Sequence, residues 1–398
     1  ADDRETQWQA LIGREAVFDL RGERDAQQAD LNTLLELAHT FDNDARRAQI
    51  HFLQARLAFA RGDYRATAAA AEAALATLPA AGNEATAIRT LGLKTAGLTR
   101  MGEMEQARQS AEAALARAEC VTDEAALAFG LVRTALYYDE AGDPTRATQL
   151  DQRAVELSRR SGDRGVNTLA LNNLAVDYIR LGLYRQAHTA LEQALALDEA
   201  LGERRGHAYH LLNLGWVYHL TGDGRTGQRL IARTMGEMTA TSDVWGEAAC
   251  HHYLAEIMEQ AQDPARAEQR FAQARQMLDQ VGDHAFAMQA RAGMARCALA
   301  LGRTPDALAW ATEVWTYIQT QGTGGVFQVF RAFQSIADIF DAAGESEQAH
   351  TVVETGHGEL IRRANQISDP AWRASFLENI AEHRAIIERR EQQQRSML

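Results

Sequence analysis

Apolar side chains recur every three or four residues along most of the chain, the pattern of helices that bury one face. Short turn sequences interrupt this pattern about every 20 residues. We therefore expect helices of roughly 15–18 residues, two in each unit of about 40 residues. One set of turns is centred on Gly22, Gly62, Gly102, Gly142, Gly182, Gly222, Gln262, Gly302 and Gly344. A second set lies halfway between and comprises Asp42, Gly82, Thr122, Gly162, Gly202, Ser242, Gly282 and Gly322.

The residues in these turns suit the ends of helices. A glycine just past a helix can adopt the left-handed conformation that satisfies the last carbonyl groups. Asp or Thr then caps the next helix, and proline is accommodated in its first turn. This order occurs in Asp143-Pro144, Asp263-Pro264 and Thr304-Pro305. The turns therefore predict where helices end and begin.

Small and large residues also keep a fixed spacing within the units. The fifth unit shows it in Leu174, Ala175, Tyr178, Gly182, Tyr184, Ala187, Leu191 and Ala194. The small residues let the two helices of a unit approach closely, and the large apolar residues fill the space between units. This spacing resembles the tetratricopeptide repeat.

The predicted fold class is all-α, a right-handed α-solenoid of tetratricopeptide-like helix pairs with a C-terminal capping helix. We place nine helix pairs in residues 1–364 and the capping helix in residues 365–390. Ser368-Asp369-Pro370 is the expected start of that helix, and residues 391–398 are expected to form a frayed polar tail.

Composition and charge exclude several functions. The chain of 398 residues carries 41 basic and 54 acidic side chains, a net charge of −13, which disfavours contact with nucleic acid. Lys94 is the single lysine and does not follow glycine, so the chain has no phosphate-binding G-x-x-x-x-G-K-[ST] loop. No apolar run is long enough to span a membrane. Cys120, Cys250 and Cys297 are far apart in the sequence, which favours a reducing compartment, and we expect a cytoplasmic protein.

The 40-residue register, the linker 161–165 and two flanking stretches, 14–38 and 367–384, resemble a known type of repeat region. It is the C-terminal region of large bacterial signal-transduction ATPases, the class that includes maltose-activator-type regulators. The resemblance implies an upstream nucleotide-binding module in the same polypeptide. The chain begins at Ala1 rather than Met, so we expect either that it is part of a longer protein, which we favour, or that a signal segment has been removed. The same register also resembles spindle-orientation adaptors that bind peptides.

A candidate ligand site follows from the repeat register, because the first helix of each unit lines the concave face of such a solenoid. The candidate residues there are Asn172, Arg180, Tyr209, Trp216, His219, His252, Glu256 and Arg296. This patch of aromatic, amide and arginine side chains could hold an extended peptide or a partner helix. The alternative is that Tyr209 and Trp216 pack between units as part of the core.

Candidate chemistry is sparse. His207 and His210, one turn apart, and the pair His251 and His252 do not form a familiar zinc ligand set, so we expect hydrogen-bonded histidines and no metal. We assign no catalytic residue and no cofactor, and we expect that the chain is not an enzyme.

Two functions remain from the sequence. The first hypothesis is a non-catalytic sensor arm of a bacterial signalling ATPase or transcription regulator, which binds a partner or inducer on its concave face. The alternative is a free-standing adaptor that recognises a peptide or a helix. Self-association through an exposed end of the solenoid is a third, weaker interpretation.

Overall fold

The computed structural model describes residues 2–41, 43–78, 83–202, 204–241 and 243–396. Every regular element in these residues is a helix, so the predicted all-α class is confirmed. The first ten helices are α1 (Asp2–Arg21), α2 (Arg24–Thr40), α3 (Asp44–Ala60), α4 (Tyr64–Thr77), α5 (Glu84–Arg100), α6 (Met104–Arg117), α7 (Glu124–Glu140), α8 (Pro144–Ser161), α9 (Arg164–Arg180) and α10 (Tyr184–Leu201). The remaining ten are α11 (Arg204–Leu220), α12 (Gly224–Ala240), α13 (Val244–Gln260), α14 (Pro264–Val281), α15 (His284–Ala300), α16 (Thr304–Gln321), α17 (Val329–Ala342), α18 (Ser346–Gln366), α19 (Pro370–Glu378) and α20 (Ala381–Ser396).

The helices form two compact units. Unit 1 comprises Ala1–Ala141, Arg146–Leu174 and Gln193–His207, and unit 2 comprises Gly142–Thr145, Ala175–Glu192 and Ala208–Leu398. The division therefore falls within α8, α9, α10 and α11, and we describe each unit by itself.

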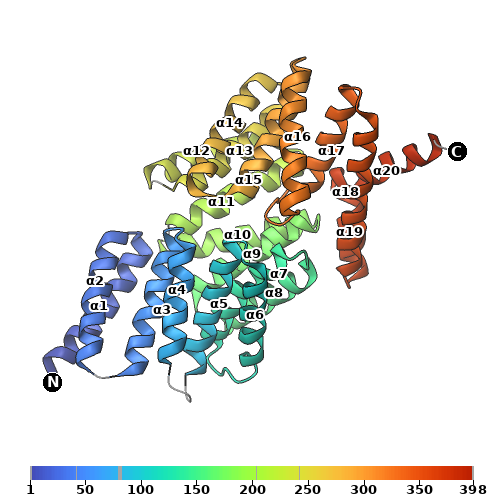
Figure 1. Cartoon of the computed structure of the whole chain (residues 1–398). Coiled ribbons are helices and arrows are strands. Elements are labelled where there is room, and N and C mark those ends of the chain that lie inside the picture. The colour runs from blue at the N-terminus through green and yellow to red at the C-terminus, as the bar shows by residue number, and fades with distance from the viewer. Residues whose placement is uncertain (1, 42, 79–82, 203, 242, 397–398) are drawn as a thin grey trace. The chain divides into compact units, whose positions relative to one another are not determined.

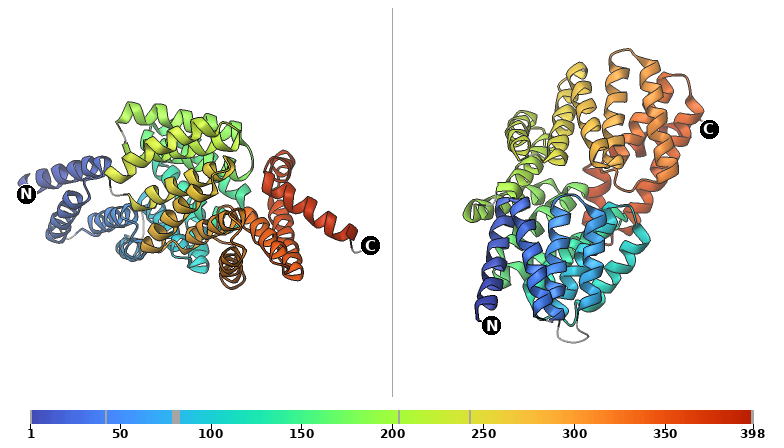
Figure 2. Two further views of the ribbon diagram at one scale, coloured as in Figure 1. Left: turned by 90° about the horizontal axis from the view of Figure 1, so that it is seen from above. Right: turned by 60° about the vertical axis from the view of Figure 1, so that its left-hand side comes forward.

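In unit 1, α1 to α6 pack in sequence order and stand side by side (Figures 1 and 2). The first helices of successive pairs also meet, because α3 contacts α5 and α5 contacts α7. Glycine makes the second contact possible. A Cβ atom on Gly130 would lie 2.9 Å from the carbonyl oxygen of Ile88, and one on Gly92 would lie 2.9 Å from the carbonyl oxygen of Gly130. The small residues in the repeat thus bring α5 and α7 into backbone contact.

Unit 2 has two layers of helices from α13 to α18. The first helices of the pairs, α13, α15 and α17, contact one another and form an inner layer, and α14, α16 and α18 pack against them (Figure 1). The core between the layers is closely filled: Phe271 on α14 is fully buried, and a Cβ atom on Gly293 of α15 would lie 2.6 Å from its ring. Polar side chains between the helices of the inner layer form the candidate site, and two of them, His252 and Arg296, also pack against Phe271.

The turns follow the sequence prediction. Positive φ angles occur at Gly22, Gly62, Gly102, Gly142, Gly162, Gly182, Gly202, Gly222, Gly282, Gly302, Gly322 and Gly344. Gln262 occupies the same register position with φ 62° and is the non-glycine residue with positive φ in the described part of the chain. The predicted turn residues Asp42, Gly82 and Ser242 lie outside the described residues.

The C-terminal segment differs from the prediction of one capping helix in residues 365–390 and a frayed tail in residues 391–398. Asp369 accepts hydrogen bonds from the backbone N–H groups of Ala371 and Trp372 and so begins a separate short helix, α19. A break after Glu378 separates it from α20, which continues through the predicted tail to Ser396. The tail is helical because its side chains have partners on α18: Arg390 pairs with Glu354 at 3.0 Å, and Gln393 lies 3.0 Å from His350.

Candidate functional site

A cluster of ionised side chains joins the inner helices of unit 2 to the C-terminal helix. Glu256 and Glu259 lie on α13, Arg296 on α15, Arg331 on α17 and Glu382 on α20. We call these five residues the Arg331 network.

Arg296 and Arg331 hold the three carboxylates together. Arg296 donates from Nη2 to Glu256 at 2.9 Å and from Nε to Glu259 at 2.7 Å. Arg331 Nη2 lies 2.8 Å from Glu256 Oε2, and its Nη1 donates to Glu382 at 3.0 Å. One guanidinium group therefore links α13 with α20.

The network keeps a buried carboxylate ionised. The side chain of Glu256 is only 1% exposed. Burial alone would raise the pKa of Glu256, but the guanidinium groups of Arg331 and Arg296 hold it below its ordinary value. A charge buried in this way requires its partners, since an unpaired buried carboxylate is strongly unfavourable. The side chain of Arg331 remains 27% exposed, so the network also reaches the surface of the inner layer.

A ladder of neutral polar groups runs beside the network. Gln289 Nε2 lies 3.0 Å from His252 Nε2 and donates to Gln328 Oε1 at 3.1 Å. Gln289 Oε1 accepts from the backbone N–H of Gln328 at 3.1 Å. His252 is fully buried, and burial lowers its pKa to about 4, so its ring is neutral at pH 7 and can accept a hydrogen bond from Nε2 of Gln289.

The predicted aromatic residues are packed against one another. Trp216 on α11 stacks on Tyr253 of α13 with ring centroids 4.6 Å apart, and His219 lies 4.8 Å from the same indole. Trp216 is 3% exposed, as expected from the alternative in which it packs between repeat units as part of the core. Burial is also the main cause of the lowered pKa of His219.

The eight predicted site residues are thus only partly brought together. Trp216, His219, His252, Glu256 and Arg296 form one continuous group in unit 2. Arg180, at the end of α9, lies with its guanidinium 4.6 Å from the ring centroid of Phe327. Tyr209, nearer the start of α11, donates to Asp243 at 3.0 Å. Asn172 belongs to unit 1.

Sequence reasoning missed Arg331, Glu382 and Phe327. A long connection, residues 322–328, replaces the usual short turn and shifts the register; Phe327 lies in it and Arg331 follows it. Glu382 lies beyond the repeats, where no periodicity indicates its position. The longer last step of the turn spacing, from Gly302 to Gly344, was the signal that the register changes here.

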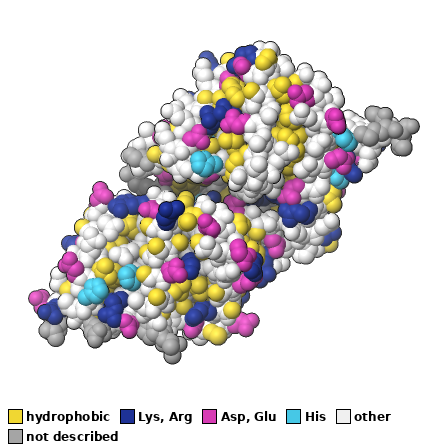
Figure 3. Space-filling model, in the orientation of Figure 1, with side chains coloured by type: hydrophobic (Ala, Val, Ile, Leu, Met, Phe, Trp, Pro, Cys, Tyr) yellow, Lys and Arg dark blue, Asp and Glu magenta, His cyan; other side chains and the backbone are white. Residues whose placement is uncertain are grey.

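The described residues contain no group of three or more His, Cys, Asp or Glu side chains placed to hold a metal ion. His251, one of the four histidines considered, lies 3.0 Å from Nη1 of Arg270. None of the described helices has both the length and the apolar character required to cross a membrane. Acidic and basic side chains are interspersed on the face of the molecule shown in Figure 3.

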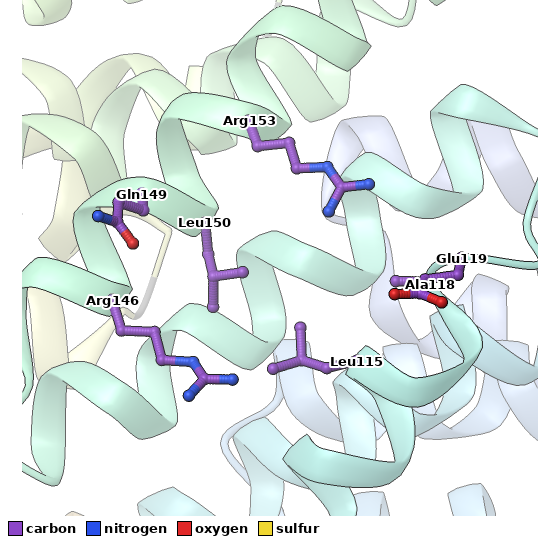
Figure 4. A pocket seen from close by; sticks show the side chains of 7 residues that line it. All are labelled: Leu115, Ala118, Glu119, Arg146, Gln149, Leu150 and Arg153. Atoms are coloured by element: carbon purple, nitrogen blue, oxygen red, sulfur yellow. The ribbon is translucent and has the colours of Figure 1, made fainter.

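Unit 1 contains an open hollow of about 320 Å³ between α6 and α8 (Figure 4). Its lining residues are Leu115, Ala118, Glu119, Arg146, Gln149, Leu150 and Arg153. The guanidinium of Arg146 lies 4.5 Å from the ring centroid of Tyr138. None of the eight predicted site residues lines this hollow.

This chain is similar to known proteins in structure but not in sequence. No protein-family model and no curated protein matches the chain. A solved Rap protein complexed with competence and sporulation factor has a TM-score of 0.69 at 14% identity, over 92% of this chain and 99% of that one. The apo quorum sensor NprR from B. thuringiensis has a TM-score of 0.53 at 10% identity, over 85% and 97%. The fold is a tetratricopeptide-type repeat solenoid. At these identities the likeness extends to the fold alone.

One neighbour corrects an expectation. Aspartyl phosphate phosphatase F from Bacillus subtilis has a TM-score of 0.52 at 11% identity, over 90% of this chain and 94% of that one. This finding contradicts the expectation, drawn from the lack of a recognisable catalytic motif, that the chain is not an enzyme, because a protein of similar fold is named as a phosphatase. Catalytic activity is determined by the residues of a local site and not by the fold, so a helical solenoid can contain a catalytic site.

Proposed function

We propose that this chain is a peptide-binding adaptor or sensor and that the peptide lies across α13, α15 and α17 of unit 2. The observation that carries the proposal is the Arg331 network, in which Arg331, Arg296, Glu259 and Glu382 are partly exposed. Charged and amide side chains fixed in this way can bind the polar backbone and charged ends of an extended peptide without losing further side-chain entropy.

The dimensions of the inner layer favour a short peptide. Packed helices lie about 8–10 Å apart, so three of them span about 16–20 Å. An extended chain covers that distance with about five or six residues. A Rap protein of similar fold binds competence and sporulation factor, and another neighbour is a quorum sensor. These comparisons support the adaptor interpretation better than the hypothesis of a sensor arm on a signalling ATPase. An upstream nucleotide-binding module and a cytoplasmic location stay predictions from the sequence.

The proposal is tested by fluorescence anisotropy with a pool of labelled random hexapeptides. We expect the wild-type chain to bind the pool, and Glu259→Gln and Arg331→Gln to bind it at least about tenfold more weakly, because each removes a charge exposed on the inner layer. Arg303→Gln is the matched control: Arg303 pairs with Glu268 and Asp306 at the start of α16, away from the inner layer. Circular dichroism shows whether each variant keeps its helices. Absence of binding to the wild-type chain, or unchanged binding by both folded variants, would contradict the proposal.

A further inference from the structure

Glu382 differs from the other two carboxylates of the Arg331 network. Glu256 and Glu259 come from α13, and each pairs with both Arg296 and Arg331. Glu382 comes from α20, beyond the repeats, and among the described side chains it pairs with Arg331 alone, at 3.0 Å. The two carboxylates of α13 already balance the two guanidinium groups. The network therefore does not need Glu382 to balance its charge.

Arg331 divides its two terminal nitrogen atoms between these partners. Its Nη2 atom faces α13, where it lies 2.8 Å from Glu256 and 3.3 Å from Glu259. Its Nη1 atom faces α20 and donates to Glu382. Both side chains of this second pair are partly exposed, Arg331 at 27% and Glu382 at 21%, and a single exposed pair contributes little to stability. A carboxylate from outside can therefore replace Glu382 on Nη1 while the pairs with α13 stay in place.

Two turns from the middle of the chain lie against α18 and α19 of unit 2. A Cβ atom on Gly182, after α9, would lie 3.0 Å from the backbone oxygen of Ser375 and 3.0 Å from Cβ of Asn379. One on Gly142, after α7, would lie 3.3 Å from Nη2 of Arg362. The corresponding glycines of other repeats have nothing within 4 Å of such an atom: Gly22, Gly62, Gly102, Gly222, Gly302 and Gly344. Repeats of a solenoid contact only their neighbours, so these two contacts are additions to the repeat pattern.

The contact with Gly182 fixes the junction between α19 and α20. Asn379, in this junction, donates from Nδ2 to the backbone oxygen of Gly182, 197 residues earlier in the sequence, at 3.3 Å. His383, the residue after Glu382, is buried with its ring centroid 4.4 Å from those of Phe330 and Phe376. Its Nδ1 atom donates to the backbone oxygen of Phe376 at 2.6 Å. The first turn of α20 is therefore held on both sides of Glu382, which keeps this carboxylate close to Arg331.

We propose that Glu382 is an autoinhibitory competitor, whose carboxylate occupies the place on Nη1 of Arg331 that a carboxylate of the bound peptide takes. This inference rests on the proposed function, which supplies the peptide as the ligand. A peptide carboxylate offers the same two oxygens to the guanidinium group and so forms the same kind of pair. Because Glu382 is tethered beside Arg331, it competes at a high effective concentration. Removing Glu382, or loosening the junction that holds it, therefore opens Arg331 to the peptide.

The test compares the full wild-type chain with Glu382→Gln in binding three labelled hexapeptide pools. The first pool lacks Asp and Glu and ends in an amide, the second differs from it in a free C-terminal carboxylate, and the third differs from it in one internal aspartate. We expect Glu382→Gln to raise the affinity for the second or the third pool, relative to the first, by roughly two- to fivefold, the range expected for a partly exposed pair. The pool that gains affinity shows whether the peptide supplies its terminus or a side chain.

Three further variants separate competition at Arg331 from a general change of charge. Glu388→Gln is the control, because Glu388 is an exposed carboxylate on the same helix, and it should leave the affinity ratio unchanged. Combining Glu382→Gln with Arg331→Gln should give no gain over Arg331→Gln alone, since the group for which the carboxylates compete is then absent. Asn379→Ala keeps Glu382 but removes the hydrogen bond to Gly182, and it should raise the ratio by a smaller factor.

An unchanged or lower ratio in folded Glu382→Gln would overturn the autoinhibition and leave the proposed function standing. An equal gain in Glu388→Gln, or a gain that persists when Arg331 is also replaced, would overturn it as well. Binding of none of the three pools by the wild-type chain or by Glu382→Gln would overturn both proposals. Circular dichroism shows whether each variant is folded, and if Glu382→Gln fails to fold, Asn379→Ala decides the question.

Discussion

The inner helices α5 and α7 of unit 1 meet through glycine, whereas α13 and α15 of unit 2 meet through ion pairs. Gly92 and Gly130 bring α5 and α7 into backbone contact, and the ion pairs between these helices, Arg89–Asp123 and Arg100–Glu140, lie at their ends at 3.5 and 3.8 Å. In unit 2, Glu256 is 1% exposed and pairs with Arg296 at 2.9 Å in the middle of the contact between α13 and α15.

This difference has an energetic meaning. Close packing through glycine joins α5 to α7 without a buried charge between them. Buried ion pairs bring a desolvation cost that apolar side chains avoid, so they are weak evidence for stability alone. The proposed function gives the Arg331 network a role in ligand binding, and the predictions below test whether the two kinds of contact respond differently to mutation.

The largest expected effect is in unit 2. Arg296→Met should lower the free energy of unfolding by about 3–5 kcal/mol, because it leaves Glu256 buried with one of its two partners. Combining it with Glu256→Met should restore a large part of that loss, since no unpaired charge is then buried. Urea denaturation followed by circular dichroism measures both. If Arg296→Met lowers the free energy of unfolding by less than about 1 kcal/mol, Arg296 does not stabilise the buried carboxylate of Glu256 as described.

The corresponding change in unit 1 is steric. Gly130→Val should lower the free energy of unfolding by about 2–3 kcal/mol, because its Cβ would lie 2.6 Å from Cγ1 of Ile88. Gly13→Ala on α1 is the control: nothing lies within 4 Å of its added Cβ, and alanine should raise stability by up to about 1 kcal/mol. The same denaturation experiment compares them. Equal stability of Gly130→Val and the wild type would mean that α5 and α7 are farther apart.

Acid should weaken unit 2 through His252. Its folded pKa of about 4 lies below the ordinary value of 6.5, so between these values the unfolded chain binds a proton that the folded chain does not. The lowered pKa of His252 should therefore reduce the free energy of unfolding by about 2 kcal/mol as the pH drops from about 7 to about 5. His252→Gln should lose that part of the pH dependence. An identical pH profile in the variant, measured by denaturation at both pH values, would exclude His252 as its source.

The smallest effect concerns the turns, which are alike in both units. Gln262 has φ 62° where other repeats have glycine, so Gln262→Gly should raise the free energy of unfolding by about 1 kcal/mol. Gly222→Ala makes the reverse change at φ 94° with open space around its Cβ and should lower it by a similar amount. Thermal unfolding compares Gln262→Gly with Gly222→Ala. If both variants shift the unfolding temperature in the same direction, the turn position does not favour glycine because of its positive φ.

The sequence predicted the helices well because turn residues are local signals. Glycine at Gly182 or Gly302 and aspartate at Asp263 act on their own helix ends, so their spacing alone indicates the fold. The C-terminal segment was predicted less well because α20 depends on partners on α18.

The candidate site was harder to predict because it depends on distant contacts. His252, Glu256 and Arg296 follow the repeat register and were identified. Phe327 lies in the irregular connection 322–328, Arg331 follows it, and Glu382 lies outside the repeats. No periodicity could place these three side chains beside the others.

Photo-crosslinking is the most direct test of where the peptide binds. A hexapeptide pool containing a photoreactive leucine is incubated with the full chain, irradiated, and the modified residues are identified by mass spectrometry. The account predicts adducts on α13, α15 and α17 that decrease in Arg331→Gln and persist in Arg303→Gln. Adducts concentrated on α3, α5 and α7, or on the hollow between α6 and α8, would contradict it.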